Sequence, residues 1–552
     1  MRRRTGGMAL AALTAVTLVA SACGGGGGGS EPQPGTSQAG GQGGEITVYG
    51  CTPQNPLIPA NTAEACGGHV MDAILAKLVE YNPDTAAPEL DIAQSIDTKD
   101  NQTFTVKLKP GYKFHDGTEV KAKNFVDAWN WAAYGPNGNL NSYFFDPIAG
   151  YADLQCGTDS KGEADCEGKP AKTKEMSGLK VVDDHTFTIK TSDKVSNLTV
   201  RLGYTAFAPL PDSFFSDPKA YGQKPIGAGP FKLDSNTDTE EVLSKFADYS
   251  GKNKPSVDKV TFRIYTDEGA AYNDVVANNL DFSDHIPTDR LVDDLWKQEL
   301  PDRNGLRDTG ELATNDFSPI DDNFKDIRMR QAISMAIDRE LINKQIFNGT
   351  RPPLDGWVSP AVDGFKAGAC GDACIFNPTE AKKLYDEVGG YKGGPLTIAV
   401  NGDAGHKPWA DAACNSIKNT LGLDCVTKVT PDFKTLRDQI VKRELKGLFR
   451  SGWVMDYPSI ENFLAPIYGT GGGSNDTDYS NPKFDAKLKE AAAAPTLDEA
   501  NKLYQEAESI LAADFPTMPM WSYKRATAWS DRVTDVRVTP FGWIDLASVK
   551  VK

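Results

Sequence analysis

The sequence predicts a chain of mixed α/β fold that is large enough for several lobes. Strand-like and helix-like hydrophobic patterns alternate along it, and no internal repeat of about 20 to 50 residues is present. Apolar residues make up 39% of the chain, and the stretch 45–552 is long enough for roughly two to four domains. Alternation of strands with helices is typical of α/β or α+β lobes.

Strands are predicted where apolar and polar residues alternate with a period of two. The run from Gln102 to Leu108 is the cleanest example, and Pro110-Gly111 ends it. Similar signals predict further strands at 45–49, 179–182, 186–189, 260–265 and 396–400.

Helices are predicted where apolar residues recur at spacings of three and four. In the stretch 328–347 these residues are Met329, Ala332, Ile333 and Ala336. The same spacing predicts helices at 69–81, 120–134, 410–421 and 433–446, and two helices within 481–513 that are separated at Pro495.

The first 44 residues predict an export leader and a tether. Three arginines precede an apolar stretch at 8–20, which is shorter than the roughly 20 residues that a membrane span needs. Residues 1–22 therefore fit a signal peptide. Residues 24–44 are almost entirely Gly, Ser, Gln, Pro and Thr, a composition typical of a flexible linker.

The end of the leader, Ala20-Ser-Ala-Cys23, resembles the lipobox of bacterial lipoproteins. The resemblance implies that Cys23 is lipidated and becomes the mature N-terminus, with 23–44 as the tether. Several acyl chains would make such an anchor effectively permanent. Ordinary secretory cleavage near Ala22 is the alternative.

The net charge of -16 excludes one class of partner. Nucleic-acid recognition requires clustered Lys and Arg, which an acidic chain does not favour. The charge also disfavours docking on anionic lipid, and we interpret it as a source of solubility for a secreted body.

Eight cysteines remain after Cys23, and an even number in an exported chain predicts disulfides. They fall into four close pairs in the sequence, which suggests Cys51–Cys66, Cys156–Cys166, Cys370–Cys374 and Cys414–Cys425, although sequence alone leaves other pairings open. A zinc site would need a second close pair or a histidine near Cys370 and Cys374, and none is present. We therefore expect no metal.

Three segments together resemble the peptide- and nickel-type family of bacterial extracellular solute-binding proteins, family 5. Residues 103–118 combine a strand with the turn F-H-D-G and are followed by a helical pattern at 120–129. Residues 226–233 are similar to the family's G-T-G-P-Y segment, and 326–339 to its R-x-A-hhxAIDR helix. The order and spacing of these segments match the family across 45–552.

The resemblance implies a fold of the type II periplasmic-binding-protein kind, with two hinged lobes and an extra domain. It places lobe I at 45–84, 205–310 and 524–552, the extra domain at 85–204, and lobe II at 311–523. Within this architecture we interpret His115-Asp116 and Asp338-Arg339 as turn caps and lobe-stabilising bonds. The lobes are expected to close around a ligand.

The segment 449–458 carries the most specific expectation about function. It resembles the R-x-G-W-x-x-D-Y segment of the oligopeptide-binding subgroup. The resemblance implies that Asp456 accepts the α-ammonium of a peptide, that Val454 bonds the peptide backbone, that Trp453 lines a side-chain pocket and that Arg450 reaches a carboxylate. Peptides of varied sequence share a backbone, an amine and a carboxylate, so a tolerant receptor recognises these groups.

Each of these residues has a structural alternative. In this alternative, Asp456 would cap a turn before Pro458, Trp453 would belong to the core, and Arg450 would pair with a neighbouring acid. By the same resemblance, four other residues are weaker candidates for the ligand site, or else core or structural residues: Glu64, Tyr143, Trp521 and Tyr523.

The sequence thus predicts a monomeric, lipid-anchored extracytoplasmic protein that passes oligopeptides to an ABC import permease and needs no cofactor. The same fold with another cargo (a nickel chelate, haem, glutathione or a sugar), or a receptor for peptide signals, is the alternative. A hydrolase is disfavoured because neither G-x-S-x-G nor H-E-x-x-H occurs.

Overall fold

The structure, a computed structural model, describes residues 43–158 and 164–552. The predicted signal peptide, the predicted lipidation site Cys23 and residues 24–42 of the predicted tether lie outside the described residues. Within them, no helix is both long and apolar enough to cross a membrane.

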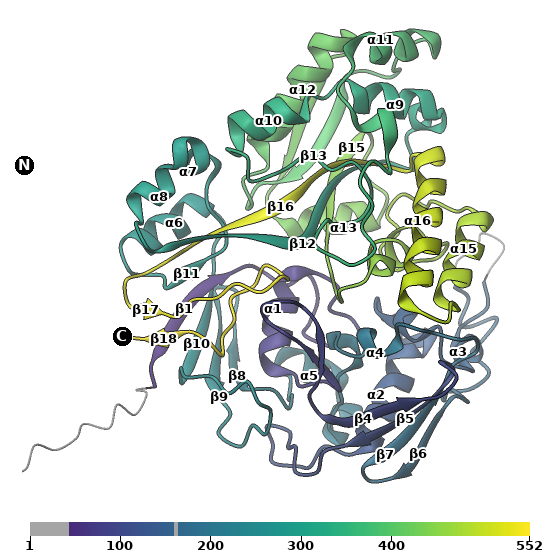
Figure 1. Cartoon of the computed structure of the whole chain (residues 1–552), viewed down its shortest axis with the longest axis vertical. Coiled ribbons are helices and arrows are strands. Elements are labelled where there is room, and N and C mark those ends of the chain that lie inside the picture. The colour runs from purple at the N-terminus through teal and green to yellow at the C-terminus, as the bar shows by residue number, and fades with distance from the viewer. Residues whose placement is uncertain (1–42, 159–163) are drawn as a thin grey trace, which may run out of the picture. The chain divides into compact units, whose positions relative to one another are not determined.

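One mixed sheet of ten strands runs through the described chain, in the order β14-β13-β15-β12-β16-β11-β1-β10-β9-β8. Two long strands, β12 (Asn304–Phe317) and β16 (Thr517–Trp529), lie between two groups of shorter strands (Figure 1). The first group contains β1 (Glu45–Gly50), β8 (Phe231–Asn236), β9 (Glu240–Lys245), β10 (Lys259–Ile264) and β11 (Phe282–Ser283). The second contains β13 (Leu396–Asn401), β14 (Cys425–Thr430) and β15 (Leu448–Val454).

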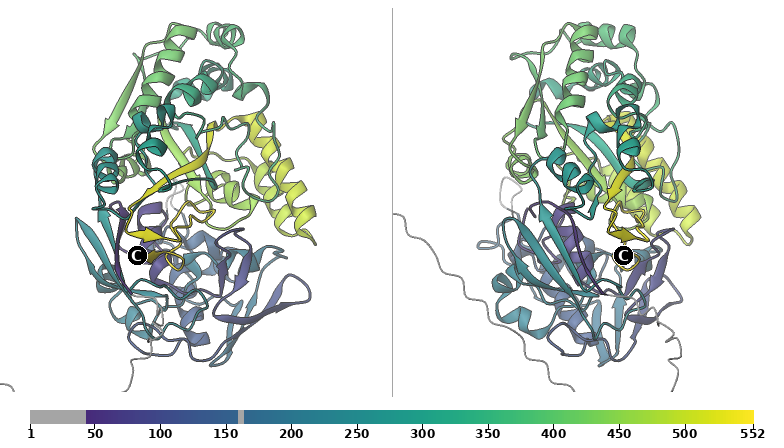
Figure 2. Two further views of the ribbon diagram at one scale, coloured as in Figure 1. Left: turned by 60° about the vertical axis from the view of Figure 1, so that its left-hand side comes forward. Right: turned by 90° about the vertical axis from the view of Figure 1, so that its left-hand side faces the viewer.

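The two long strands connect these groups. They pair antiparallel, with an irregularity in register between Asp308 and Leu312. In β16 every residue from Thr517 to Tyr523 is buried, as expected for a strand that is covered on both faces. Both views in Figure 2 show this yellow strand running between the two halves of the sheet.

A separate four-stranded antiparallel sheet in the described chain has the order β4-β5-β7-β6. Its strands are β4 (Ala93–Thr98), β5 (Thr103–Leu108), β6 (Leu179–Asp183) and β7 (Thr186–Lys190), and α2 (Ala122–Ala133) packs against it. Phe125 of α2 stacks on Phe187 of β7 with ring centroids 5.7 Å apart. Trp129 is fully buried beside them and donates its indole N–H to the Phe207 carbonyl at 3.1 Å.

The F-H-D-G turn connects this small sheet to the first strand group. The Gly227 N–H donates to His115 Nδ1 at 3.1 Å, and the His115 N–H donates to the Gly227 carbonyl at 2.8 Å. Gly227 must be glycine here, because a Cβ would lie 1.9 Å from the Ile74 carbonyl oxygen. Two of the segments that carry the family resemblance therefore contact each other and have an architectural role.

Two of the predicted helices differ from those in the structure. The predicted helix 69–81 is α1 (Ala65–Ile74) followed by strand β2 (Val79–Tyr81), which pairs with β3 (Pro88–Leu90). The predicted helix 328–347 is two helices, α9 (Ile327–Met335) and α10 (Arg339–Ile346). Asp338 causes the break, because its carboxylate caps α10 by accepting the Leu341 N–H at 2.9 Å.

The remaining predicted helices occur as α12 (Lys407–Leu421), α13 (Phe433–Val441), α15 (Pro482–Ala492) and α16 (Leu497–Asp514). Shorter or unpredicted helices are α3 (Tyr151–Leu154), α4 (Leu198–Arg201), α5 (Pro218–Gln223), α6 (Glu268–Val276), α7 (Thr288–Leu291), α8 (Leu295–Glu299), α11 (Pro378–Glu387) and α14 (Ala465–Tyr468). Strands β17 (Val533–Thr534) and β18 (Lys550–Val551) form a small hairpin near the C-terminus.

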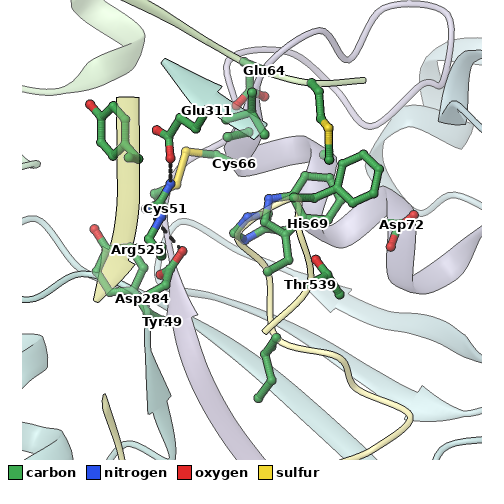
Figure 3. A pocket seen from close by; sticks show the side chains of 18 of the residues that line it. Tyr49, Cys51, Glu64, Cys66, His69, Asp72, Asp284, Glu311, Arg525 and Thr539 are labelled. Atoms are coloured by element: carbon green, nitrogen blue, oxygen red, sulfur yellow. Dashed lines mark hydrogen bonds and ion pairs between the residues drawn. A yellow bond between two sulfur atoms is a disulfide. The ribbon is translucent and has the colours of Figure 1, made fainter. Parts of the chain in front are cut away.

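Four disulfides join the cysteines of the described residues. They are Cys51–Cys66, Cys156–Cys166, Cys370–Cys374 and Cys414–Cys425, the pairs suggested by closeness in the sequence. The first holds the loop after β1 against the start of α1 (Figure 3). The last connects α12 to β14.

Candidate functional site

A cavity of about 430 Å³ lies between the two strand groups. This volume is within the range of about 300 to 1,000 Å³ that is usual for small-ligand pockets. Its walls come from β1 and α1 on one side, from the segment 450–456 on the other, and from β12 and β16 between them.

Asp456 lies two residues after the end of β15 and is oriented by Asn462. The Asn462 side chain donates to Asp456 Oδ2 at 2.8 Å, and its Oδ1 accepts the Asp456 backbone N–H at 2.8 Å. The same Oδ1 accepts the indole N–H of Trp453 at 2.9 Å. Because Asn462 is fully buried, it fixes both the carboxylate and the indole at the cavity wall.

The Asp456 carboxylate has a hydrogen-bond donor beside it but no cation. Burial raises its pKa to about 7, although the hydrogen bond from Asn462 and the Tyr204 hydroxyl favour the charged form. No Lys, Arg or His nitrogen of the described residues lies within 4.0 Å of it. A buried carboxylate of this kind is stabilised when a cation enters beside it.

The acid next to Asp456 is already satisfied. Glu461 forms a buried ion pair with Arg201 at 3.2 Å and accepts the Tyr457 hydroxyl at 2.5 Å. Arg201 therefore pairs with Glu461 and not with Asp456, which lines the cavity without an ion pair of its own.

The strand that leads to Asp456 has one free edge. On one side β15 pairs with β12 along its full length, from Leu448 to Val454. On the other side it pairs with β13 only at Leu448 and Phe449. The Met455 N–H donates to Gly310 of β12 at 2.8 Å, so alternation places the backbone groups of Val454 and Gly452 on the free side.

A second buried carboxylate of the cavity, Asp284, is fully partnered (Figure 3). Arg525 of β16 pairs with Glu311 of β12 and lies 3.6 Å from Asp284. His285 Nδ1 lies 2.8 Å from the other oxygen of Asp284. Burial opposes ionisation of Asp284, yet His285 and Arg525 hold its pKa below its ordinary value.

The cavity also contains two guanidinium groups without an acid. Arg450 lies over the Phe433 ring at 5.5 Å, and Arg351 lies over the Tyr523 ring at 3.8 Å. Neither has a carboxylate oxygen of the described chain within 4.0 Å.

Both of these arginines act electrostatically on His406. Burial, then Arg450 and Arg351, lower the pKa of His406 well below its ordinary value, so the ring is neutral. Its Nδ1 accepts the Trp409 indole N–H at 3.0 Å, which leaves the proton on Nε2. His406 is therefore a neutral donor at the cavity wall.

Most residues singled out in the sequence line this cavity; they are Asp456, Trp453, Val454, Arg450, Glu64, Trp521 and Tyr523. Two of them also have structural roles. Glu64 caps α1 by accepting the Gly67 N–H at 3.1 Å, and Trp521 is 1% exposed and packs edge-on against Trp409 at 5.1 Å.

Tyr143 does not line the cavity. Its ring stacks on Phe144 at 4.3 Å, although burial and the nearby Asp456 raise its pKa. The tyrosine whose hydroxyl favours the charged form of Asp456 is Tyr204, which sequence reasoning missed. Asn462, Arg351 and His406 were missed as well, because no local pattern marks them.

Metal binding has little basis in the described residues. No group of three or more His, Cys, Asp or Glu side chains among them is placed to hold an ion. The cavity instead offers separate positive and negative groups, an arrangement suited to an organic zwitterion.

Comparison with known proteins assigns the architecture. Residues 87–475 match the model of bacterial extracellular solute-binding proteins, family 5. The chain is 25% identical to the oligopeptide-binding protein of Bacillus subtilis over 529 residues, which is 92% of each chain.

Solved structures agree with the fold. The Escherichia coli murein tripeptide binding protein superposes with a TM-score of 0.81 at 21% identity, covering 92% of this chain and 99% of that one. A peptide-bound oligopeptide-binding protein of Listeria monocytogenes gives 0.78 at 19% identity, covering 93% and 100%. At these identities the likeness concerns the fold, and it confirms the predicted type II binding-protein class.

Proposed function

The chain belongs to the family 5 bacterial extracellular solute-binding proteins, and we propose that it captures oligopeptides in its cavity and delivers them to an ABC import permease. The relatives described above are named as peptide-binding proteins. The polar groups of this cavity match the amine, backbone and carboxylate that every peptide carries.

Asp456 is the observation that supports a peptide most directly. It is a half-buried carboxylate that accepts a hydrogen bond from Asn462, and no cation of the described residues lies within ion-pair distance of it. A free α-ammonium group completes it with a charge-assisted hydrogen bond. A neutral solute would leave the buried carboxylate unpaired, which is costly.

The rest of the cavity complements a peptide backbone and carboxylate. The free edge of β15 presents the backbone groups of Gly452 and Val454, so a peptide strand adds there by β-augmentation. Arg450 and His406 supply donors without an acid partner and serve the ligand's carboxylate. We also propose the lobe and extra-domain boundaries stated above.

Isothermal titration with tri-, tetra- and penta-alanine, each free or N-acetylated, tests the peptide proposal. We expect binding of at least one free peptide and heavy weakening by acetylation at every length. Equal binding of both forms, or binding of neither while another solute co-purifies, would overturn it.

Membrane attachment is part of the same proposal. Lipidation of Cys23 would hold the protein on the extracytoplasmic face of the membrane, where the permease lies. We expect Cys23→Ser to release the protein into the medium with unchanged peptide affinity. Mass spectrometry that finds unmodified Cys23 in the mature membrane-bound protein would rule the anchor out.

A further inference from the structure

Four arginines line the cavity, and only two of them have a carboxylate of the described residues within ion-pair distance. Arg525 pairs with Glu311, and Arg437 pairs with Asp476 at 2.5 Å. Arg450 and Arg351 have none. The proposed function uses Arg450 for the peptide's α-carboxylate and leaves Arg351 without a role.

We propose that Arg351 forms a second anion-binding subsite beside Arg450 and His406, and that the protein prefers peptides whose C-terminal residue carries an acidic side chain. This preference rests on the proposed function, because it assumes that a peptide lies in the cavity with its amine at Asp456.

The backbone around Arg351 is fixed rigidly. Residues 350–353 run along β16, with the Ser522 N–H donating to the Pro352 carbonyl at 2.9 Å and the Lys524 N–H to the Thr350 carbonyl at 2.9 Å. The Arg351 N–H itself donates to Asn343 Oδ1 at 2.9 Å. The side chain thus starts from a defined point on the cavity wall.

The Arg351 side chain is held by aromatic rings and not by hydrogen bonds. Its guanidinium lies 3.8 Å from the Tyr523 ring centroid and 5.4 Å from that of Phe347. None of its side-chain N–H groups has an acceptor within the described residues. Stacking on a ring covers a face of the guanidinium and leaves the donors at its edge for a planar carboxylate.

A continuous aromatic wall places Arg351 near His406. Phe347 packs on Trp521 at 5.1 Å, Trp521 on Trp409 at 5.1 Å, and Trp409 bonds His406. This row of contacts links Arg351 to His406, one of the two groups that the proposed function assigns to the ligand's carboxylate.

Charge balance favours a ligand with two negative charges at this end. A single α-carboxylate pairs with one guanidinium and leaves the other without a carboxylate within ion-pair distance. Glu268, an acid of the cavity wall beside Gly405, makes no ion pair with either arginine, and Glu311 already pairs with Arg525. A glutamate or aspartate side chain next to the α-carboxylate supplies the missing charge.

Isothermal titration tests this with six peptides: di-, tri- and tetra-alanine, each extended at the C-terminus by Glu or by Gln. We expect the wild-type protein to prefer Glu over Gln by about 10- to 100-fold at the length that binds best, as for hydrogen bonds to charged groups. Arg351→Met should abolish the preference and leave the affinity for the Gln peptide nearly unchanged.

Arg328→Met is the matched control, because Arg328 is an exposed arginine that pairs with Asp326 and lies outside the cavity. It should keep the full preference for Glu, and thermal unfolding should show that both variants fold. If Gln and Glu peptides bind the wild type equally, or if Arg351→Met keeps the preference, the inference is wrong while the peptide function stands. If none of the six peptides binds, the proposed function fails and the inference fails with it.

Discussion

Asp456 and Asp284 line the same cavity, but the protein completes the bonding of only one of them. Asp284 contacts Arg525 and His285, and its pKa is held below its ordinary value. Asp456 has an amide and a hydroxyl as partners, and burial raises its pKa to about 7. The difference separates a structural carboxylate from one that awaits a ligand.

The positions of the two acids in the fold give this difference its meaning. Asp284 follows β11, and its partner Arg525 lies on β16 and also binds Glu311 on β12, so the cluster ties the two connecting strands to the first strand group. Asp456 follows the strand with a free edge. We interpret the Asp284 site as one that holds the strands together and the Asp456 site as one that recognises the ligand.

Breaking the structural site should have the largest effect on stability. Arg525→Met leaves Glu311 without its cation and leaves Asp284 with His285 as its basic partner, which should lower the free energy of unfolding by about 3 to 5 kcal/mol. Urea denaturation measures this. Arg450→Met, which breaks no ion pair, is the control and should cost less than about 1 kcal/mol. Equal losses of unfolding free energy in both variants would show that the ion pairs of Arg525 make no particular contribution to stability.

The open site should make peptide affinity depend on pH. An ammonium group lowers the pKa of Asp456, so the bound form carries fewer protons than the free form. The affinity is therefore complete above the free-state pKa of about 7 and is lost as the pH falls through it, by about tenfold per unit towards pH 5. Titrations at four pH values between 5 and 8 check this. An affinity that does not change with pH below 7 would contradict the protonation of Asp456 in the ligand-free protein.

A smaller effect is expected when one partner of Asp456 is removed. Tyr204→Phe deletes a hydroxyl that favours the charged form of Asp456, so Asp456 should be harder to ionise and peptide affinity should fall about 3- to 10-fold. Tyr143→Phe is the matched control, because Tyr143 lies nearby but makes no bond to Asp456. If both variants lose affinity equally, the Tyr204 bond does not contribute specifically.

The sequence predicted the parts of this comparison that are local. The segment 450–456 combines a strand with the residues of a ligand wall, so its pattern was visible without a structure. The break between α9 and α10 was missed, because apolar spacing continues across Asp338 and only its cap interrupts the helix. In the same way the apolar residues after α1 belong to strand β2.

Long-range partners were out of reach for the same physical reason. Tyr204 meets Asp456, and Arg525 meets Asp284, only after the strand groups assemble around β12 and β16. Arg351 and His406 are brought together by an aromatic wall drawn from three separate segments. No spacing rule along the chain encodes such contacts.

The role of Asp456 is tested most directly by a double-mutant cycle between Asp456→Ala and N-acetylation of the peptide. Each change alone should weaken binding by about 2 to 5 kcal/mol, because each leaves one buried charge or its partner unpaired. The variant should still fold, as thermal unfolding will show.

Isothermal titration of both proteins with both peptides gives the coupling free energy. If Asp456 holds the ammonium group, the two changes remove the same interaction, and acetylation should hardly weaken binding to the variant any further. If the two losses simply add, Asp456 and the amine do not interact, and the assignment of this carboxylate as the ammonium site is wrong.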